Sequence, residues 1–239
     1  MSNIGRVALI TGGSKGIGLG VAESLVRDGV RVAVTSRSKK SAEAAAAYLN
    51  TISDGFAIGI EADVRSLESQ QRAVDLIVVQ WGRLDYVIAN AGVGHFANIF
   101  DLTPELWQET IDINLTGVFN TVKATLEELK SSKGYLITIA SLAGTNFFAN
   151  GSAYNASKFG LVGFSQAVML DVRNHGIRVT TIMPGSVSSH FNNHEPSEKD
   201  AWKIQPEDIG EMIVGLIHMP ERTLPSKIEV RPTAPPSAK

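Results

Sequence analysis

The sequence contains no cysteine, which excludes disulfide bonds, thiolate catalysis and metal sites built from cysteine. Long apolar runs are also missing, because no stretch approaches the roughly 20 residues that a membrane-spanning helix needs. The first residues lead into an expected strand at 6–10 without the apolar segment of a signal peptide. These features lead us to expect a cytoplasmic protein.

A strong charge of either sign is missing as well. The 22 basic and 24 acidic residues give a formal net charge of −2. Basic residues are dispersed apart from one cluster at 37–40, so no basic stripe follows a nucleic-acid backbone. Apolar residues make up 44% of the chain, which is typical of a globular protein. We therefore expect neither a nucleic-acid partner nor a membrane partner.

Short apolar runs rich in β-branched residues alternate with longer segments of helical periodicity. The expected strands are 6–10, 32–35, 57–61, 84–89, 135–140, 178–183 and 227–230. The expected helices are 18–28, 40–50, 66–81, 104–130, 152–174 and 206–218. This alternation predicts a single α/β domain over residues 1–239, with a Rossmann-type doubly wound parallel sheet of about seven strands and helices on both faces. The Pro-rich tail at 231–239 is expected to be extended.

A glycine-rich loop joins the first expected strand to the first expected helix. Glycines at this point let the backbone turn tightly and approach a pyrophosphate, while the helix N-terminus offers unpaired N–H groups. The loop therefore predicts a dinucleotide-binding corner, and a ligand-free glycine turn is the ordinary alternative. The residues expected to take part are Gly12, Ser14, Lys15, Gly16, Ile17 and Gly18.

The same loop allows a second interpretation. Residues 12–16 match G-x-S-x-G, the nucleophile elbow of hydrolases, with Ser14 as the nucleophile. Such a serine needs an oxyanion donor from an earlier strand–helix loop, and no expected strand precedes this one. It also needs an acid and a histidine further along, and the scattered histidines stand in no diagnostic setting. A serine hydrolase is therefore a remote alternative, and the same scatter predicts no metal site.

Tyr154 and Lys158 lie four residues apart on an expected helix, so both side chains project from one face. A phenol has a reference pKa of about 10 and is a poor catalyst at neutral pH. We expect the nearby ammonium to lower the pKa of Tyr154 and make proton exchange easier. Ser141 follows the strand expected at 135–140, where its hydroxyl can hold a carbonyl oxygen. An exposed helix pair and a capping serine are the ordinary alternatives.

Taken together, these motifs resemble those of the short-chain dehydrogenase/reductase family, including its 3-oxoacyl-acyl-carrier-protein reductases. The similarity covers about residues 5–185 in the family's order and spacing. The matching stretches are Thr11-Gly12-x-x-x-Gly16-x-Gly18, Asp63-Val64, Asn90-Ala91-Gly92, Asn114, Ser141, Tyr154-x-x-x-Lys158 and Pro184-Gly185. The resemblance implies hydride transfer between a nicotinamide and a carbonyl or alcohol carbon.

The resemblance also implies roles for individual residues. Ser141 would orient the substrate oxygen, and Tyr154 would be the general acid–base. Lys158 would hold the nicotinamide ribose, and Asn114 would support a water relay to it unless it only satisfies backbone at a helix irregularity. The other positions expected to bind the cofactor are Asp63, Val64, Asn90, Ala91, Gly92, Pro184, Gly185, Val187 and Ser189. Helix capping is the ordinary alternative for Asp63, and a plain turn is the alternative for 90–92.

The end of the second expected strand predicts which nicotinamide cofactor is used. An acid there accepts hydrogen bonds from a free ribose 2′-hydroxyl, but Arg37 occupies the position. Arg37 and Lys15 are expected to bind a 2′-phosphate, and Ser36 is expected to donate a hydrogen bond to it. The expected cofactor is therefore NADP(H). Lys39 and Lys40 are interpreted as an ordinary solvated helix start.

Three loops, 93–98, 142–153 and 186–203, are expected to line the substrate side. They carry a mixed aromatic set, which favours a largely apolar ketone or aldehyde if half of it faces the cleft. The set is His95, Phe96, Phe147, Phe148, Phe191 and Trp202. The sequence after 224 lacks the Gly-rich ending of many ketoacyl reductases, which argues against an acyl-carrier-protein substrate.

The same ending makes the usual tetramer of the family less secure. The helices that carry Asn114 and Tyr154 are still expected to form a homodimer or homotetramer. An NADP-binding regulatory protein without catalytic activity is an alternative of a different class. The presence of Asn114, Ser141, Tyr154 and Lys158 argues against it, because such a protein would not need all four groups.

Overall fold

The computed structural model describes residues 3–234, and within them seven strands form one parallel sheet in the order β3-β2-β1-β4-β5-β6-β7. The strands are β1 (Val7–Ile10), β2 (Arg31–Ser36), β3 (Ala57–Glu61), β4 (Tyr86–Ala89), β5 (Tyr135–Ile139), β6 (Arg178–Pro184) and β7 (Lys227–Val230). All seven expected strands are confirmed. The strand order reverses between β1 and β4, which is where a doubly wound sheet opens a crevice for ligands.

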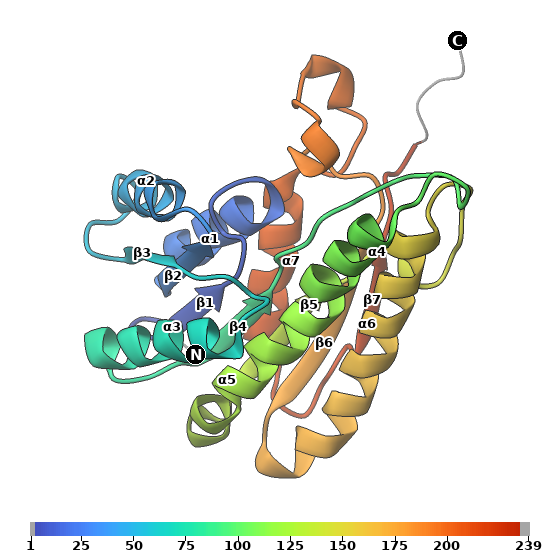
Figure 1. Ribbon diagram of the computed structural model, residues 1–239. Helices are drawn as coiled ribbons and strands as arrows, with labels where there is room; N and C mark the ends of the chain where they lie inside the picture. The colour runs from blue at the N-terminus through green and yellow to red at the C-terminus, as the bar shows by residue number, and fades with distance from the viewer. Residues whose placement is uncertain (1–2, 235–239) are drawn as a thin grey trace.

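Helices cover both faces of the sheet, as predicted (Figure 1). On one face lie α1 (Gly16–Arg27), α2 (Lys39–Asn50) and α7 (Pro206–His218), and on the other lie α3 (Leu67–Trp81), α5 (Gly117–Ser132) and α6 (Ser152–Val172). Neighbouring strand residues point to opposite layers: Ile10 packs with α1 and α7, whereas Leu9 packs with α3 and α5. Both are fully buried, which explains why the central strand β1 is continuously apolar.

Side-chain caps fix where several helices begin. Ser38 accepts a hydrogen bond from Ser41 N at the start of α2, and Ser66 accepts one from Ser69 N at the start of α3. Thr103 caps α4 (Pro104–Ile111), and proline occupies the first position of that helix. The boundary expected at Thr103 is therefore confirmed.

The prediction of one continuous helix over 104–130 is wrong, because the range is interrupted by a wider turn. The chain forms α4, then a wide π-helical turn, η1 (Asp112–Thr116), and only then α5. A Cβ built on Gly117 would lie 2.7 Å from Val64 Cγ2, so the chain passes very close to the loop after β3. Such π turns often occur at functional sites, and this one carries Asn114.

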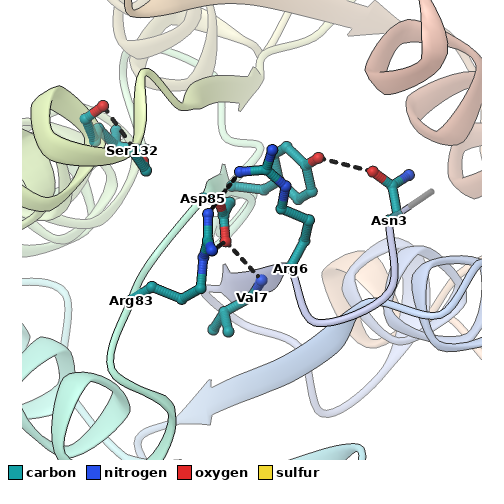
Figure 2. A network of polar contacts seen from close by, with 8 residues as sticks. Asn3, Arg6, Val7, Arg83, Asp85 and Ser132 are labelled. Carbon is teal, nitrogen blue, oxygen red and sulfur yellow. Dashed lines mark hydrogen bonds and ion pairs between the residues drawn. The ribbon is translucent and has the colours of Figure 1, made fainter. Parts of the chain in front are cut away.

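A buried carboxylate ties the amino ends of β1 and β4 together (Figure 2). Asp85 accepts hydrogen bonds from Arg6 Nη1 and Arg83 Nη2, both at 2.6 Å, and from Val7 N at 3.0 Å. Its side chain is only 1% exposed. These contacts fix the register of the two strands whose opposite ends frame the crevice.

β7 lies at the sheet edge beside β6 and leads back toward the carboxyl ends of the strands (Figure 1). Residues 231–234 form neither helix nor strand, and the remainder of the expected extended tail, 235–239, lies outside the described residues. Within 3–234, no helix combines the length and the apolar character needed to cross a bilayer.

Candidate active site

A cleft of about 1200 Å³ runs along the carboxyl ends of the strands. Of the residues predicted to bind or react, all but two line it, and Gly18 and Asn114 are buried behind its wall. Those on the wall are Gly12, Ser14, Lys15, Gly16, Ile17, Ser36, Arg37, Asp63, Val64, Asn90, Ala91, Gly92, Ser141, Tyr154, Lys158, Pro184, Gly185, Val187 and Ser189. The fold thus brings residues from the whole length of the chain to one surface.

The glycine loop after β1 needs its glycines for conformation and for space. Gly12 and Gly16 have φ values of +64° and +57°, in the left-handed region that favours glycine. A Cβ on Gly12 would lie 3.0 Å from Ala91 Cα, and one on Gly18 would lie 2.5 Å from the Gly12 carbonyl oxygen. The backbone therefore packs too tightly for side chains and leaves its own surface open to the cleft. This geometry suits a phosphate at the N-terminus of α1.

Asn90 holds this loop against the end of β4. Its Nδ2 donates to the Thr11 carbonyl at 2.9 Å and to the Gly12 carbonyl at 3.2 Å. In return, Thr11 Oγ1 accepts hydrogen bonds from Asn90 N at 3.0 Å and Ala91 N at 3.1 Å. The 90–92 stretch is therefore more than a plain turn, because it fixes the shape of the glycine loop.

Ser141, Tyr154 and Lys158 come together in one corner of the cleft. Ser141 follows β5 and accepts a hydrogen bond from Ala143 N at 3.1 Å, so it caps the short turn η2 (Leu142–Gly144). Lys158 Nζ lies 5.7 Å from the Tyr154 ring centroid and donates to the Ile139 carbonyl at 3.1 Å. Three groups able to polarise or protonate a carbonyl oxygen thus share one buried site.

The expectation that Lys158 lowers the pKa of Tyr154 is wrong. Burial raises the pKa of the phenol above its ordinary value, and the Ser141 side chain opposes this rise only in part. Burial also lowers the pKa of Lys158 to about 8, because the interior disfavours its charge. Tyr154 is therefore a neutral phenol near pH 7, a state suited to donating a proton.

Asn114 lies behind the wall in the wide turn η1. Its Oδ1 accepts from Val93 N at 2.8 Å, and its Nδ2 donates to the Val93 carbonyl at 2.9 Å and to Ser157 Oγ at 3.1 Å. The side chain thus satisfies backbone at a helix irregularity and holds the Gly92–Val93 wall in place. Its part in a water relay stays a prediction.

Positive charge gathers at the other end of the cleft. Arg37 and Lys15 both line it and are exposed. Arg37 directly follows β2, and Lys15 lies within the glycine loop. Lys39, in contrast, pairs with Glu43 on the outer surface of α2 at 3.8 Å, as expected for an ordinary helix start. Asp63 lies on the cleft wall, where the Arg65 guanidinium holds the pKa of its carboxyl below the usual value. Asp63 does not cap α3, because Ser66 does.

Aromatic rings surround the Tyr154 corner. The Phe96 ring centroid lies 5.4 Å from that of Tyr154 and 5.7 Å from that of Phe148, and the Phe191 centroid lies 5.6 Å from that of Tyr154. These three phenylalanines line the cleft, as do His95 and Trp202. Phe147 does not line it and is 85% exposed. Most of the expected aromatic set therefore faces the cleft.

The segment between β6 and α7 extends beyond the sheet (Figure 1), and several of its residues line the cleft. Asp200 anchors it by accepting from His194 Nε2 at 2.6 Å and pairing with Lys203 Nζ at 2.5 Å. Ser189, which is expected to bind the cofactor, lines the cleft and lies beside Gly16. Its neighbour Ser188 is buried, and its N–H is bonded to the Ile204 carbonyl.

Sequence reasoning missed the part of the cleft wall that follows β7: Arg231, Pro232 and Ala234. The sequence predicted only an extended tail there. A usable signal was present, because a seventh parallel strand must end at the same edge as the others and deliver the following residues to the cleft.

The serine-elbow interpretation finds no support in the geometry. Within 3–234, no histidine hydrogen-bonds with Ser14, and three of the histidines pair instead with Glu109, Asp200 and Asp28. Ser14 lies on the cleft wall beside Lys15 and Gly16, at the start of α1. That position suits contact with a phosphate better than nucleophilic attack.

Comparison with known proteins agrees with this geometry. A family model described as short chain dehydrogenase matches residues 6–200. The chain belongs to the short chain dehydrogenase family. The resemblance identified from the motifs is thereby confirmed, and the protein is an oxidoreductase of Rossmann-type fold.

Members of the short chain dehydrogenase family with different substrates are similar to this chain. The 3-oxoacyl-[acyl-carrier-protein] reductase FabG of Escherichia coli is 33% identical over 186 residues, 77% of this chain and 75% of that protein. The sepiapterin reductase of Chlorobaculum tepidum is 32% identical over 237 residues, 96% of this chain and 97% of that protein. An alcohol dehydrogenase from the archaeon Thermococcus sibiricus, solved with 5-hydroxy-NADP, superposes with a TM-score of 0.89 at 29% identity, covering 95% of this chain and 97% of that one.

Proposed function

We propose that this protein reduces a small, largely apolar ketone or aldehyde with NADPH, or oxidises the corresponding alcohol with NADP+. The observation that carries this proposal is the convergence of Ser141, Tyr154 and Lys158 in one buried, aromatic-lined corner of the cleft. A protein that only binds the cofactor has no use for a neutral phenol, a hydroxyl and a buried ammonium side by side.

The residues of this corner handle the proton. When bound, the reduced nicotinamide supplies the hydride. Ser141 donates a hydrogen bond to the substrate oxygen and orients it toward Tyr154. Tyr154, protonated near neutral pH, gives its proton to that oxygen as negative charge develops there. The raised pKa of Tyr154 favours reduction over oxidation near pH 7, since oxidation requires the phenolate.

The cleft residues fit a dinucleotide that carries an extra phosphate. The glycine loop exposes backbone without side chains at Gly12 and Gly16, which lets a pyrophosphate approach closely. Arg37 and Lys15 can approach a ribose 2′-phosphate from two sides, with Ser36 as a further donor. An acid at position 37 would instead repel that phosphate. The exposed ends of both cations keep them free to reorient toward a ligand.

The substrate end of the cleft supports an apolar compound of modest size. Phe96, Phe148 and Phe191 present ring surface beside Tyr154, and such surface binds apolar or aromatic groups. A free small molecule is favoured over an acyl chain tethered to a carrier protein, because the sequence after 224 lacks the Gly-rich ending of many ketoacyl reductases. A homodimer or homotetramer and a cytoplasmic location stay predictions.

One assay tests the proposal. Oxidation of NADPH and of NADH is followed by absorbance with aryl ketones, aldehydes, diketones and quinones as substrates. We expect turnover with aryl ketones or aldehydes, and a preference for NADPH of about tenfold or more, as expected from one charge-assisted hydrogen bond. Tight NADPH binding without turnover of any carbonyl compound would instead indicate a regulatory protein.

A further inference from the structure

The C-terminal segment is held in a fixed position at the reacting end of the cleft. β7 pairs with β6 in parallel, with Val230 opposite Pro184. The ladder continues one step further, because Gly185 N donates to the Val230 carbonyl at 2.8 Å. Arg231 therefore follows a hydrogen-bonded residue and lies at the same sheet edge as Ser141, which follows β5.

Close packing connects this segment to the Ser141 turn. A Cβ built on Gly185 would lie 3.1 Å from Leu142 Cδ1 and 3.4 Å from Pro232 Cδ. Leu142 directly follows Ser141, so the proline ring and the Ser141 turn meet over one glycine. Arg231 and Pro232 line the same cleft as Ser141 and Tyr154.

The Arg231 guanidinium has more N–H donors than its hydrogen bond to Glu229 uses. Its Nη2 donates to Glu229 Oε2 at 2.9 Å, and the side chains are 56% and 42% exposed. A surface pair of this kind is weak and exchanges partners readily. A guanidinium carries five N–H donors in a planar fork that matches a carboxylate. Glu229 also accepts a hydrogen bond from Thr145 Oγ1 at 3.5 Å. This contact joins the Arg231–Glu229 pair to the turn that follows Ser141.

Arg231 differs from the other charged residues of the cleft wall in its position and in its partner. Among the described residues of the cleft wall, Asp63 is the one carboxylate, and it lies at the Arg37 end. Lys203 is neutralised by Asp200, and Lys158 is bound to the Ile139 carbonyl under Tyr154. Arg231 is paired as well, but its partner Glu229 does not line the cleft, so the reacting end of the wall presents a cation with no wall carboxylate beside it. A substrate that carries a negative charge is favoured there.

We infer that Arg231 is a specificity-determining residue that binds the carboxylate of an oxo-acid substrate whose carbonyl is held by Ser141 and Tyr154. This inference rests on the proposed carbonyl reduction and names its substrate class. The apolar part of the substrate lies against Phe96, Phe148 and Phe191, and its carboxylate displaces Glu229 from the guanidinium.

The test compares acids with their neutral esters in the wild type and in Arg231→Gln. Phenyl-substituted α-, γ- and δ-oxo acids and their methyl esters are reduced with NADPH, and their binding to the enzyme–NADPH complex is measured by calorimetry. We expect Arg231→Gln to lower kcat/KM for the preferred acid about tenfold or more, mainly through KM, the loss expected from a charge-assisted hydrogen bond. Rates with the ester should stay within about twofold, since the ester carries no charge.

Two matched variants sharpen the result. Glu229→Gln frees the guanidinium and should improve KM for the acid, whereas Arg222→Gln makes the same charge change in the exposed loop before β7 and should alter nothing. Equal acid-to-ester ratios in the wild type and Arg231→Gln overturn the inference. If no compound is turned over, calorimetry still decides: acid binding that depends on Arg231 supports the inference while the proposed reduction fails, and binding that does not depend on it overturns the inference.

Discussion

Lys158 Nζ lies 5.7 Å from the centroid of the Tyr154 ring, and burial moves the pKa values of the two groups apart. In water a lysine and a tyrosine titrate at nearly the same pH, about 10. Here the pKa of Lys158 falls to about 8 while that of Tyr154 rises, because both groups lose solvation of their charged forms. The corner therefore combines an ammonium that is easily deprotonated with a phenol that holds its proton.

Replacing Tyr154 by Phe removes the proton donor and keeps the ring in the aromatic cluster. We expect kcat for carbonyl reduction to fall by about two to four orders of magnitude, the usual contribution of a general acid. The affinity for NADPH, measured by fluorescence titration, should change little. Tyr48→Phe, on the exposed surface of α2, is the control and should behave as the wild type. Undiminished turnover in Tyr154→Phe would exclude this mechanism.

As the pH rises, the profile of kcat/KM should show the titration of Lys158 at a lower pH than that of Tyr154. The ammonium is present below a pH of about 8 and is lost above it, whereas Tyr154 keeps its proton beyond its ordinary value of 10. If the charged form of Lys158 assists the reaction, kcat/KM for reduction falls as the pH rises through about 8. Lys158→Arg should move this limb to a much higher pH, because a guanidinium stays charged. A limb near pH 8 that survives in Lys158→Arg would assign it to another group.

The buried charge of Lys158 should also lower the free energy of unfolding at neutral pH. Its pKa is lower in the folded chain than in the unfolded chain. Below pH 8 the lysine is protonated in both states, and the folded state must bury that charge. The penalty is complete below about 8 and disappears as the pH rises to about 10.5. Lys158→Met should therefore raise the free energy of unfolding at pH 7 by up to on the order of 3 kcal/mol, with little gain at pH 10.5. Denaturant unfolding at both pH values checks this, with the exposed Lys123→Met as control.

Much of the fold followed from the sequence because its signals are local. The central strands β1, β4 and β5 are short, mostly apolar runs, and the start of the helix at Pro104 is marked by its N-cap residue Thr103. The motif residues reached one surface because parallel strands place their carboxyl ends at one edge. The π turn around Asn114 was not predictable in this way, since it depends on Val64 and Val93, which are distant in sequence.

The pKa shifts in the site were harder to predict from the sequence than the identity of its residues. Spacing places Lys158 on the same helix face as Tyr154 but does not reveal how deeply either is buried. Desolvation outweighs the opposing effect of Ser141, and the pKa of Tyr154 moves upward. Arg231 was missed for a similar reason, because its place in the cleft follows from the pairing of β7 with β6.

Arg37 is expected to select the cofactor. Arg37→Asp places a negative charge where a 2′-phosphate would lie, so kcat/KM with NADPH should fall about tenfold to hundredfold while that with NADH holds or rises. Steady-state kinetics with both cofactors measure the ratio. Lys39→Asp is the control, because Lys39 pairs with Glu43 outside the cleft and should leave the ratio unchanged. An unaltered ratio in Arg37→Asp would mean that this end of the cleft does not bind a 2′-phosphate.

Asp85 is expected to stabilise the sheet without taking part in catalysis. Removing its carboxylate leaves Val7 N without this partner and places two guanidiniums together at the amino ends of β1 and β4. Because both arginines are partly exposed and can hydrate, we expect Asp85→Ala to lower the free energy of unfolding by about 2–3 kcal/mol, below the usual cost of a fully buried pair. Glu68→Ala breaks an exposed pair with Arg72 and should cost less than about 0.5 kcal/mol. Urea denaturation separates the two variants, and kcat/KM well below the unfolding temperature should stay at the wild-type value in both. Equal losses of stability would show that the Asp85 network does not hold the strands together.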